Sequence, residues 1–136
     1  MRRWLAPFVV LLALLPSLTQ AARQPDDYVV LCYHDIVDLK LTPNLKLYPQ
    51  TIRRDTLIRH FNWIKQQGYH PVSFQQVLDA KAGKAALPEK AILLSFDDGY
   101  ESFYRLVYPL LKLYNYPAVF ALVGSWLDVA DDKMVP

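Results

Sequence analysis

The sequence has little cysteine, little net charge and no long apolar run, and each shortage excludes a class of protein. Cys32 is the only cysteine among the 136 residues, so no disulfide can form within the chain. The formal net charge is only +2, which gives no indication of nucleic acid as a partner. No internal repeat or low-complexity segment is present. With 53% hydrophobic and 21% charged residues, the chain has the composition of a globular protein with room for one domain.

The first 21 residues have the pattern of a secretory signal peptide. Arg2 and Arg3 precede an apolar run at 4–15, and Ala21 is a small residue of the kind that precedes a cleavage site. The alternative, an uncleaved membrane anchor, requires roughly 20 apolar residues, whereas this run is shorter and contains a proline. We therefore expect residues 22–136 to be exported to the periplasm or the cell envelope, including its outer membrane.

Apolar segments typical of strands alternate with amphipathic segments typical of helices, which predicts an α/β fold with a parallel sheet or barrel. The expected strands cover residues 28–33, 69–72, 91–96 and 117–123, and the expected helices cover residues 51–67, 73–80 and 102–114. Gly68 is expected to end the first helix, and Ser73 and Gln76 form a capping-box pattern at the start of the second. Pro109 is expected to kink or shorten the third helix. Residues 39–50 are expected to form a loop that can cover a cleft.

Charged side chains follow two of the expected strands, each of which is apolar throughout and therefore expected to be covered on both faces. Asp97 and Asp98 follow the third strand and His34 follows the first, so a parallel fold would bring them to one functional face. Two adjacent carboxylates repel each other unless a proton or a cation is shared, and Gly99 permits a sharp turn beside a ligand. The alternative is that Asp98 and Gly99 form a simple turn and Asp97 caps a helix. Cys32, inside the first strand pattern, is expected to be a buried structural thiol.

Several sequence blocks have the character of family motifs: L-C-Y-H-D-I at 31–36, F-N-W-I-K-Q-Q-G-Y-H-P-V-S-F at 61–74, S-F-D-D-G-Y at 95–100 within the longer match at 87–104, V-Y-P-L-L-K at 107–112 and V-G-S-W-L-D at 123–128. These blocks resemble the polysaccharide deacetylases, metal-dependent carbohydrate esterases with a NodB-homology domain. The resemblance covers essentially the whole chain after the expected signal peptide. Within the family, the blocks are similar to the branch that deacetylates exported poly-β-1,6-N-acetyl-D-glucosamine in biofilm-forming bacteria.

The resemblance implies the N-terminal part of a distorted (β/α) barrel and the hydrolysis of amide bonds. It implies that Asp97 is the general base, that Asp98 is a ligand of a divalent metal ion of unknown identity, and that His34 is the general acid. The implied substrate is an N-acetylglucosamine polysaccharide, and envelope export machinery is a further implied partner. The family completes its metal site with a histidine pair in a later H-x(3–4)-H-type motif, which this sequence does not contain. We therefore expect residues 22–136 to be the N-terminal portion of a truncated deacetylase domain that is inactive alone.

Two other functions remain as alternatives. Trp63, Trp126 and the nine tyrosines would suit a non-catalytic glycan-binding or scaffold protein of the cell envelope. A glycosidase places two carboxylates about 5 to 10 Å apart across the scissile bond, a spacing for which two adjacent aspartates are poorly suited. His60 and His70 are expected to be structural or surface residues. The sequence indicates neither the oligomeric state, nor a lipid anchor, nor a second C-terminal domain.

Overall fold

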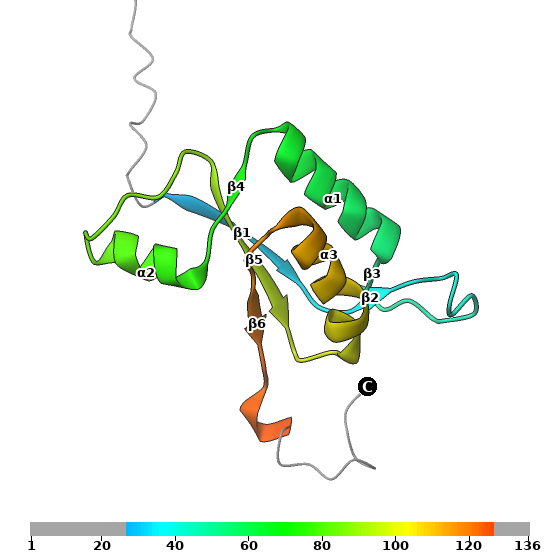
Figure 1. The fold of residues 1–136 in the computed structure, drawn as a ribbon. Coiled ribbons are helices and arrows are strands. Elements are labelled where there is room, and N and C mark those ends of the chain that lie inside the picture. Colours follow the sequence, from blue (N-terminus) through cyan, green and yellow to red (C-terminus); the bar gives the residue numbers. More distant parts are fainter. Residues whose placement is uncertain (1–26, 127–136) are drawn as a thin grey trace, which may run out of the picture.

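The structure, a computed structural model, describes residues 27–126, which form a parallel sheet with helices packed against it (Figure 1). The expected signal peptide at 1–21 lies outside the described residues. The elements are β1 (Tyr28–Tyr33), β2 (Ile36–Val37), β3 (Ile52–Arg53), α1 (Arg54–Gln66), β4 (His70–Pro71), α2 (Phe74–Lys81), β5 (Ala91–Asp97), a π-helical segment (Phe103–Val107), α3 (Tyr108–Tyr114), β6 (Val119–Ala121) and a 3₁₀ turn (Gly124–Trp126). Among these elements, no helix has the length and apolar character needed to cross a membrane.

β5 is the central strand of the main sheet. It pairs in parallel with β1 along one edge, and with β4 and then β6 along the other. The register between β1 and β5 sets Cys32 opposite Ser95. Because side chains alternate along a strand, Leu94 and Phe96 point to one face of the sheet, whereas Ser95 and Asp97 point to the other. The sheet thus separates an apolar side from a side that carries polar groups at its end.

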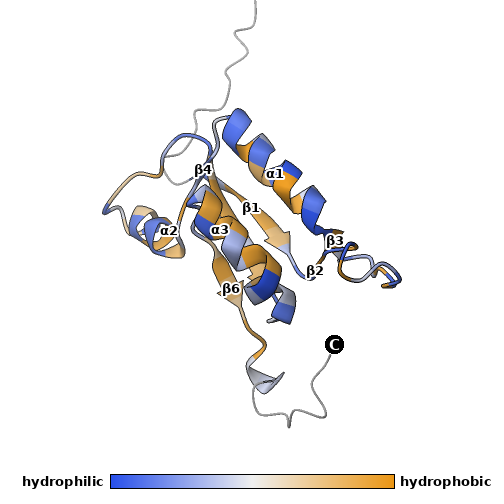
Figure 2. Cartoon of the chain, turned by 45° about the vertical axis from the view of Figure 1, so that its right-hand side comes forward, coloured by the Kyte–Doolittle hydropathy of each residue, from blue (hydrophilic) through white to orange (hydrophobic). Residues whose placement is uncertain are grey.

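The hydrophobic core lies mainly between the sheet and the helices α1 and α3. Its buried residues are Tyr33, Ile36, Leu57, Phe61, Ile64, Ile92, Leu94, Phe96, Val107, Leu110 and Leu111. A smaller cluster joins the start of β5 to α2 and consists of Val72, Val77, Ala91 and Leu93. In Figure 2, β1 and β6 are mostly hydrophobic, and α1 carries hydrophilic and hydrophobic residues on different sides. This amphipathic pattern explains why α1 packs through Leu57, Phe61 and Ile64, which recur at helical spacing.

The predicted ends of α1 and α2 are confirmed by hydrogen bonds. Gly68 has a φ of +69°, and the N–H of Tyr69 donates to the carbonyl of Ile64 at 3.0 Å, which closes the C-terminus of α1. At the start of α2, the N–H of Gln76 donates to Ser73 Oγ at 3.2 Å, and the Ser73 N–H donates to Gln76 Oε1 at 2.8 Å. These two bonds form the capping box that the sequence predicts.

Several element boundaries differ from the prediction, among them those of α1 and β6, and Pro109 acts as expected. α1 begins at Arg54 rather than at residue 51, because the two residues before it form β3 and pair in parallel with β2. β6 is shorter than the expected strand at 117–123. Pro109 lies in the first turn of α3, immediately after the π-helical segment. A proline has no N–H to donate to the preceding turn, so the regular helix starts there.

The prediction that β1 is covered on both faces is wrong. Among residues 27–126, only β5 pairs with β1, and α1 covers only the face that carries Tyr33. On the other face the side chain of Val30 is 49% exposed and Cys32 is exposed as well. An apolar run therefore predicted the strand correctly and its surroundings incorrectly, since hydrophobicity does not specify what packs on each face.

Candidate active site

The carboxyl ends of β1 and β5 bring together the residues that the sequence singles out. Asp97 is the last residue of β5, and His34 directly follows β1. Because the two strands are parallel and adjacent, their ends meet at one edge of the sheet. Asp98 and Gly99 then turn the chain with φ angles of +72° and +78°. A φ above zero is ordinary for a glycine, and among other residues aspartate is one of those that adopt it most often, so both residues suit this sharp turn.

The carboxylate of Asp97 accepts a hydrogen bond on each of its oxygens. Cys32 Sγ donates to Oδ2 at 3.0 Å, and Ser95 Oγ donates to Oδ1 at 2.5 Å. The bonds from Cys32 and Ser95 lower the pKa of Asp97, partial burial opposes them, and the charge of His34 lowers it further. Asp97 is therefore an ionised carboxylate held in one orientation by two donors.

Cys32 lies beside Asp97, and the prediction that it is a buried structural thiol is wrong. Its side chain is exposed on the open face of β1, opposite Ser95 on β5. The hydrogen bond to Asp97 raises the pKa of the thiol to about 11, and partial burial and the charges of Asp97 and Asp98 act in the same direction. The thiol is therefore protonated at neutral pH and serves as a hydrogen-bond donor.

His34 and Asp98 lie next to each other at the same edge. Nε2 of His34 is 3.9 Å from Oδ2 of Asp98, and their side chains are 33% and 30% exposed. Solvent and a ligand can therefore reach both groups. Gly99 follows directly, and a Cβ at this position would lie 2.9 Å from Cδ2 of Leu122. The turn that presents Asp98 is thus packed against the segment that follows β6.

Sequence reasoning missed the two donors to Asp97 and one tether between the strand ends. Ser95 is the one polar residue within an otherwise apolar stretch of β5, and it stands two positions before Asp97. That spacing places both side chains on one face of a strand, so it was a usable signal. The tether is Ser102, whose Oγ donates to Asp35 Oδ1 at 2.8 Å and accepts from the N–H of Ile36 at 3.2 Å. It joins the segment after β1 to the segment after β5.

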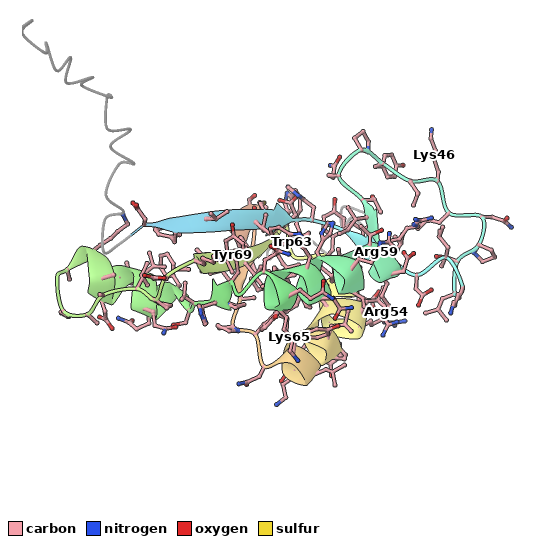
Figure 3. The ribbon with its side chains drawn as sticks, turned by 90° about the horizontal axis from the view of Figure 1, so that it is seen from above. Lys46, Arg54, Arg59, Trp63, Lys65 and Tyr69 are labelled. Carbon is pink, nitrogen blue, oxygen red and sulfur yellow. The ribbon has the colours of Figure 1, made fainter. Side chains whose placement is uncertain are left out.

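The other residues considered in the sequence lie elsewhere. His60 and His70 are both exposed, as expected of surface residues, and His60 Nδ1 is 3.3 Å from the hydroxyl of Tyr33. Trp63 is 50% exposed and stacks on Tyr69, with ring centroids 5.4 Å apart. Figure 3 shows Trp63 and Tyr69 near each other, with Arg54, Arg59 and Lys65 spread along α1. Trp126 lies in the 3₁₀ turn after β6.

A groove of about 760 Å³ opens beside the site and is lined both by residues of the loop predicted at 39–50 and by residues around the start of the π-helical segment. Its lining includes Asp35, Leu45, Tyr48 and Tyr100. None of His34, Asp97 and Asp98 lines it. Residues of the loop line this groove, which adjoins the aspartates without containing them, and the covering role of the loop stays a prediction.

The side chains at this edge are of the types that bind a transition metal. They comprise the two carboxylates of Asp97 and Asp98, the imidazole of His34 and the thiol of Cys32. Nitrogen and sulfur donors suit zinc and similar ions, whereas magnesium and calcium prefer oxygen alone. The residues present therefore fit a divalent ion of the zinc type.

The sequence and the fold are similar to known deacetylases. Residues 84–135 match the family model described as polysaccharide deacetylase. The chain is 40% identical over 117 residues to the poly-beta-1,6-N-acetyl-D-glucosamine N-deacetylase of Escherichia coli K12, a match that covers 84% of this chain and 17% of that protein. The fold is similar to a de-N-acetylase from Aggregatibacter actinomycetemcomitans, with 55% identity and a TM-score of 0.71 over 80% of this chain and 42% of that chain. It is also similar to the deacetylase domain of BpsB from Bordetella bronchiseptica, with 36% identity and a TM-score of 0.60 over 84% and 45%.

These relatives confirm the resemblance carried by the sequence motifs. They also confirm the α/β fold with a parallel sheet, since two solved deacetylases superpose on most of this chain. The chain spans 17% of the length of the Escherichia coli relative and less than half of each of these two structures. Residues 84–135 thus match the polysaccharide deacetylase family, and most of the chain is similar to known deacetylases.

Proposed function

We propose that this chain provides the catalytic aspartates of a metal-dependent N-deacetylase that acts on an exported N-acetylglucosamine polysaccharide. The observation that carries the proposal is the position of Asp97, held by two hydrogen bonds at the same sheet edge as Asp98 and His34. The relative from Escherichia coli supports poly-β-1,6-N-acetyl-D-glucosamine as the polymer. The signal-peptide pattern at 1–21 supports action in the periplasm or the cell envelope.

Asp97 has the properties of a general base. Its two donors hold the carboxylate in one orientation and favour the ionised form, which is the form that accepts a proton. As a water molecule attacks the carbonyl carbon of the acetamide group, Asp97 would take a proton from that water. Asp98 differs from Asp97 in its backbone conformation, since its φ of +72° places it in the turn that follows the strand.

Asp98 would hold the divalent ion through its carboxylate. When bound, the ion supplies a lowered pKa for the attacking water and a polarised carbonyl oxygen. Asp98 is partly exposed, and the turn through Gly99 presents it away from the packed core. With Asp98 on the ion and Asp97 free, the two adjacent carboxylates have different functions, and the positive charge offsets their repulsion.

His34 would act as the general acid. The amide C–N bond breaks only when the departing nitrogen gains a proton, because an amide anion is a poor leaving group. His34 is partly exposed at the same edge, with Nε2 3.9 Å from Asp98, so it can hold a proton close to the reacting bond. The products are acetate and a glucosamine unit whose amine carries the proton from His34. Acid and base catalysis of this kind contributes about 100- to 10,000-fold each.

The experiment is a deacetylation assay on the full-length protein with N-acetylglucosamine polysaccharide as substrate and acetate release as the measurement. Asp97→Asn should lower kcat/KM by about 100-fold or more, because the amide cannot accept the proton. Asp79→Asn, in α2, is the matched control and should keep wild-type activity. A chelator should remove activity, and a divalent ion should restore it.

Unchanged activity in Asp97→Asn would contradict the base role. No acetate release by the wild type under any metal condition would contradict the enzyme and favour the glycan-binding alternative. In that case, binding of the polymer should depend on exposed aromatic residues such as Trp63 rather than on Asp97.

A further inference from the structure

A second group of metal-ligand atoms lies at the same edge and leaves out Asp98. Cys32, His34 and Asp97 each offer one ligand atom, and the three atoms all lie within 4.8 Å of one another. Cys32 and Asp97 are already joined by a hydrogen bond of 3.0 Å between Sγ and Oδ2. Cys32 lies in β1, Asp97 is the last residue of β5, and His34 directly follows β1, so the pairing of the two strands brings the three side chains to one edge.

The chemistry of this group differs from that of a site built on Asp98. One thiol, one imidazole and one carboxylate form a mixed S, N, O set of the kind found around zinc. With Zn–S near 2.3 Å and Zn–N and Zn–O near 2.1 Å, the ligand atoms of a tetrahedral site are roughly 3.3 to 3.6 Å apart. The observed separations require only small side-chain rotations, because Cys32 is exposed and the other two are partly exposed.

We propose that Cys32, His34 and Asp97 form a second, inhibitory site for zinc or a similar borderline-soft cation. The site is distinct from the catalytic metal position at Asp98. Its existence rests only on the three side chains, whereas its inhibitory effect rests on the proposed function, in which Asp97 is the base and His34 the acid. A cation bound here occupies the carboxylate and the imidazole that the reaction needs.

Binding replaces the proton that Cys32 now donates to Asp97. The S–H bond breaks, the proton passes to solvent, and the sulfur and one carboxylate oxygen bind the cation. Hard cations such as magnesium do not bind, because they gain little from sulfur and nitrogen ligands. The enzyme should therefore be activated by a low concentration of zinc and inhibited by excess zinc, but not by excess magnesium.

Cys32→Ser separates the two roles of the residue. A serine hydroxyl can still donate to Asp97, whereas it is a much weaker zinc ligand than a thiolate. Full-length wild type and Cys32→Ser are titrated with cobalt(II), a spectroscopic substitute for zinc, and the thiolate-to-cobalt charge-transfer band is recorded. The band should appear in the wild type and be absent from the variant. Excess-zinc inhibition, measured relative to each protein's own activity at low zinc, should need at least about ten times more zinc in the variant.

The two measurements test different parts of the proposal: the cobalt spectrum tests the site, and the zinc titration tests its inhibitory effect. A cobalt spectrum without a difference between wild type and Cys32→Ser would overturn the second site. Equal zinc inhibition in the two proteins would overturn its inhibitory effect. If neither protein released acetate but the difference band were present, the site would stand and the proposed function would fall.

Discussion

Gly99 should tolerate substitution less well than Gly68 and Gly83, the other described glycines with positive φ. Of these three positions, only at Gly99 would an added Cβ come within 4 Å of another side chain. In Gly99→Ala, an L-residue at a φ of +78° costs about 1 to 2 kcal/mol. The new Cβ would also lie 2.9 Å from Cδ2 of Leu122. Leu122 is 50% exposed and can rotate, so this contact should cost about 1 kcal/mol, the low end of the overpacking range. We expect the free energy of unfolding to fall by about 2 to 3 kcal/mol.

Gly68→Ala is the matched control. Gly68 has a φ of +69°, and an added Cβ would have no atom within 4 Å. This variant should therefore lose only the free energy that an L-residue costs at a positive φ. Both variants are measured by urea denaturation, and Gly99→Ala should be about 1 kcal/mol less stable than Gly68→Ala. In a Leu122→Ala background, the extra loss at Gly99 should disappear. Equal losses at the two glycines, or an extra loss that persists without the Leu122 side chain, would refute the packing argument.

Three further predictions concern the base, a helix cap and a buried tyrosine. In Ser95→Ala the hydrogen bond from Cys32 to Asp97 remains and the one from Ser95 is lost, so the pKa of Asp97 should rise. The acidic limb of the pH profile of kcat/KM should then move to higher pH, and an unmoved limb would contradict the assignment of Asp97 as the general base. Ser73→Ala removes the capping box of α2 and should lower the free energy of unfolding by about 1 kcal/mol in urea, whereas no loss would mean that the cap contributes little. Burial raises the pKa of the Tyr33 hydroxyl from 10.0 to about 12, so on raising the pH the unfolded state loses this proton before the folded state does. The free energy of unfolding should therefore fall as the pH rises from 10 to 12, and it should fall less in Tyr33→Phe, which has no hydroxyl.

Local features of the structure were predictable because they depend on neighbouring residues. The capping box at Ser73 and Gln76 and the left-handed turn at Gly68 involve groups within a few positions of each other. The apolar run before Asp97 likewise predicts β5, which is buried along most of its length. Even the interruption at Pro109 follows from a missing N–H in a single residue.

Features that depend on distant segments were predicted poorly. Ile52–Arg53 became β3 because β2 lies beside it, a pairing that no helical spacing reveals. Cys32 was expected to be buried because it lies in an apolar run, yet an apolar run specifies a strand and not its covering. The tether from Ser102 to Asp35 joins residues 67 positions apart and leaves no mark on the local pattern.

The sequence alone determined the residue types at the strand ends, the parallel α/β fold and the resemblance to polysaccharide deacetylases, because hydrophobic periodicity and motif identity are properties of consecutive residues. The tertiary structure decided how these residues act on each other. Parallel pairing of β1 with β5 sets Cys32 opposite Ser95, and the alternation of side chains puts both on the face of Asp97. That register gives Asp97 two hydrogen-bond donors, whereas Asp98 lies in a turn beside His34. The two adjacent carboxylates therefore differ in environment although both belong to aspartate residues.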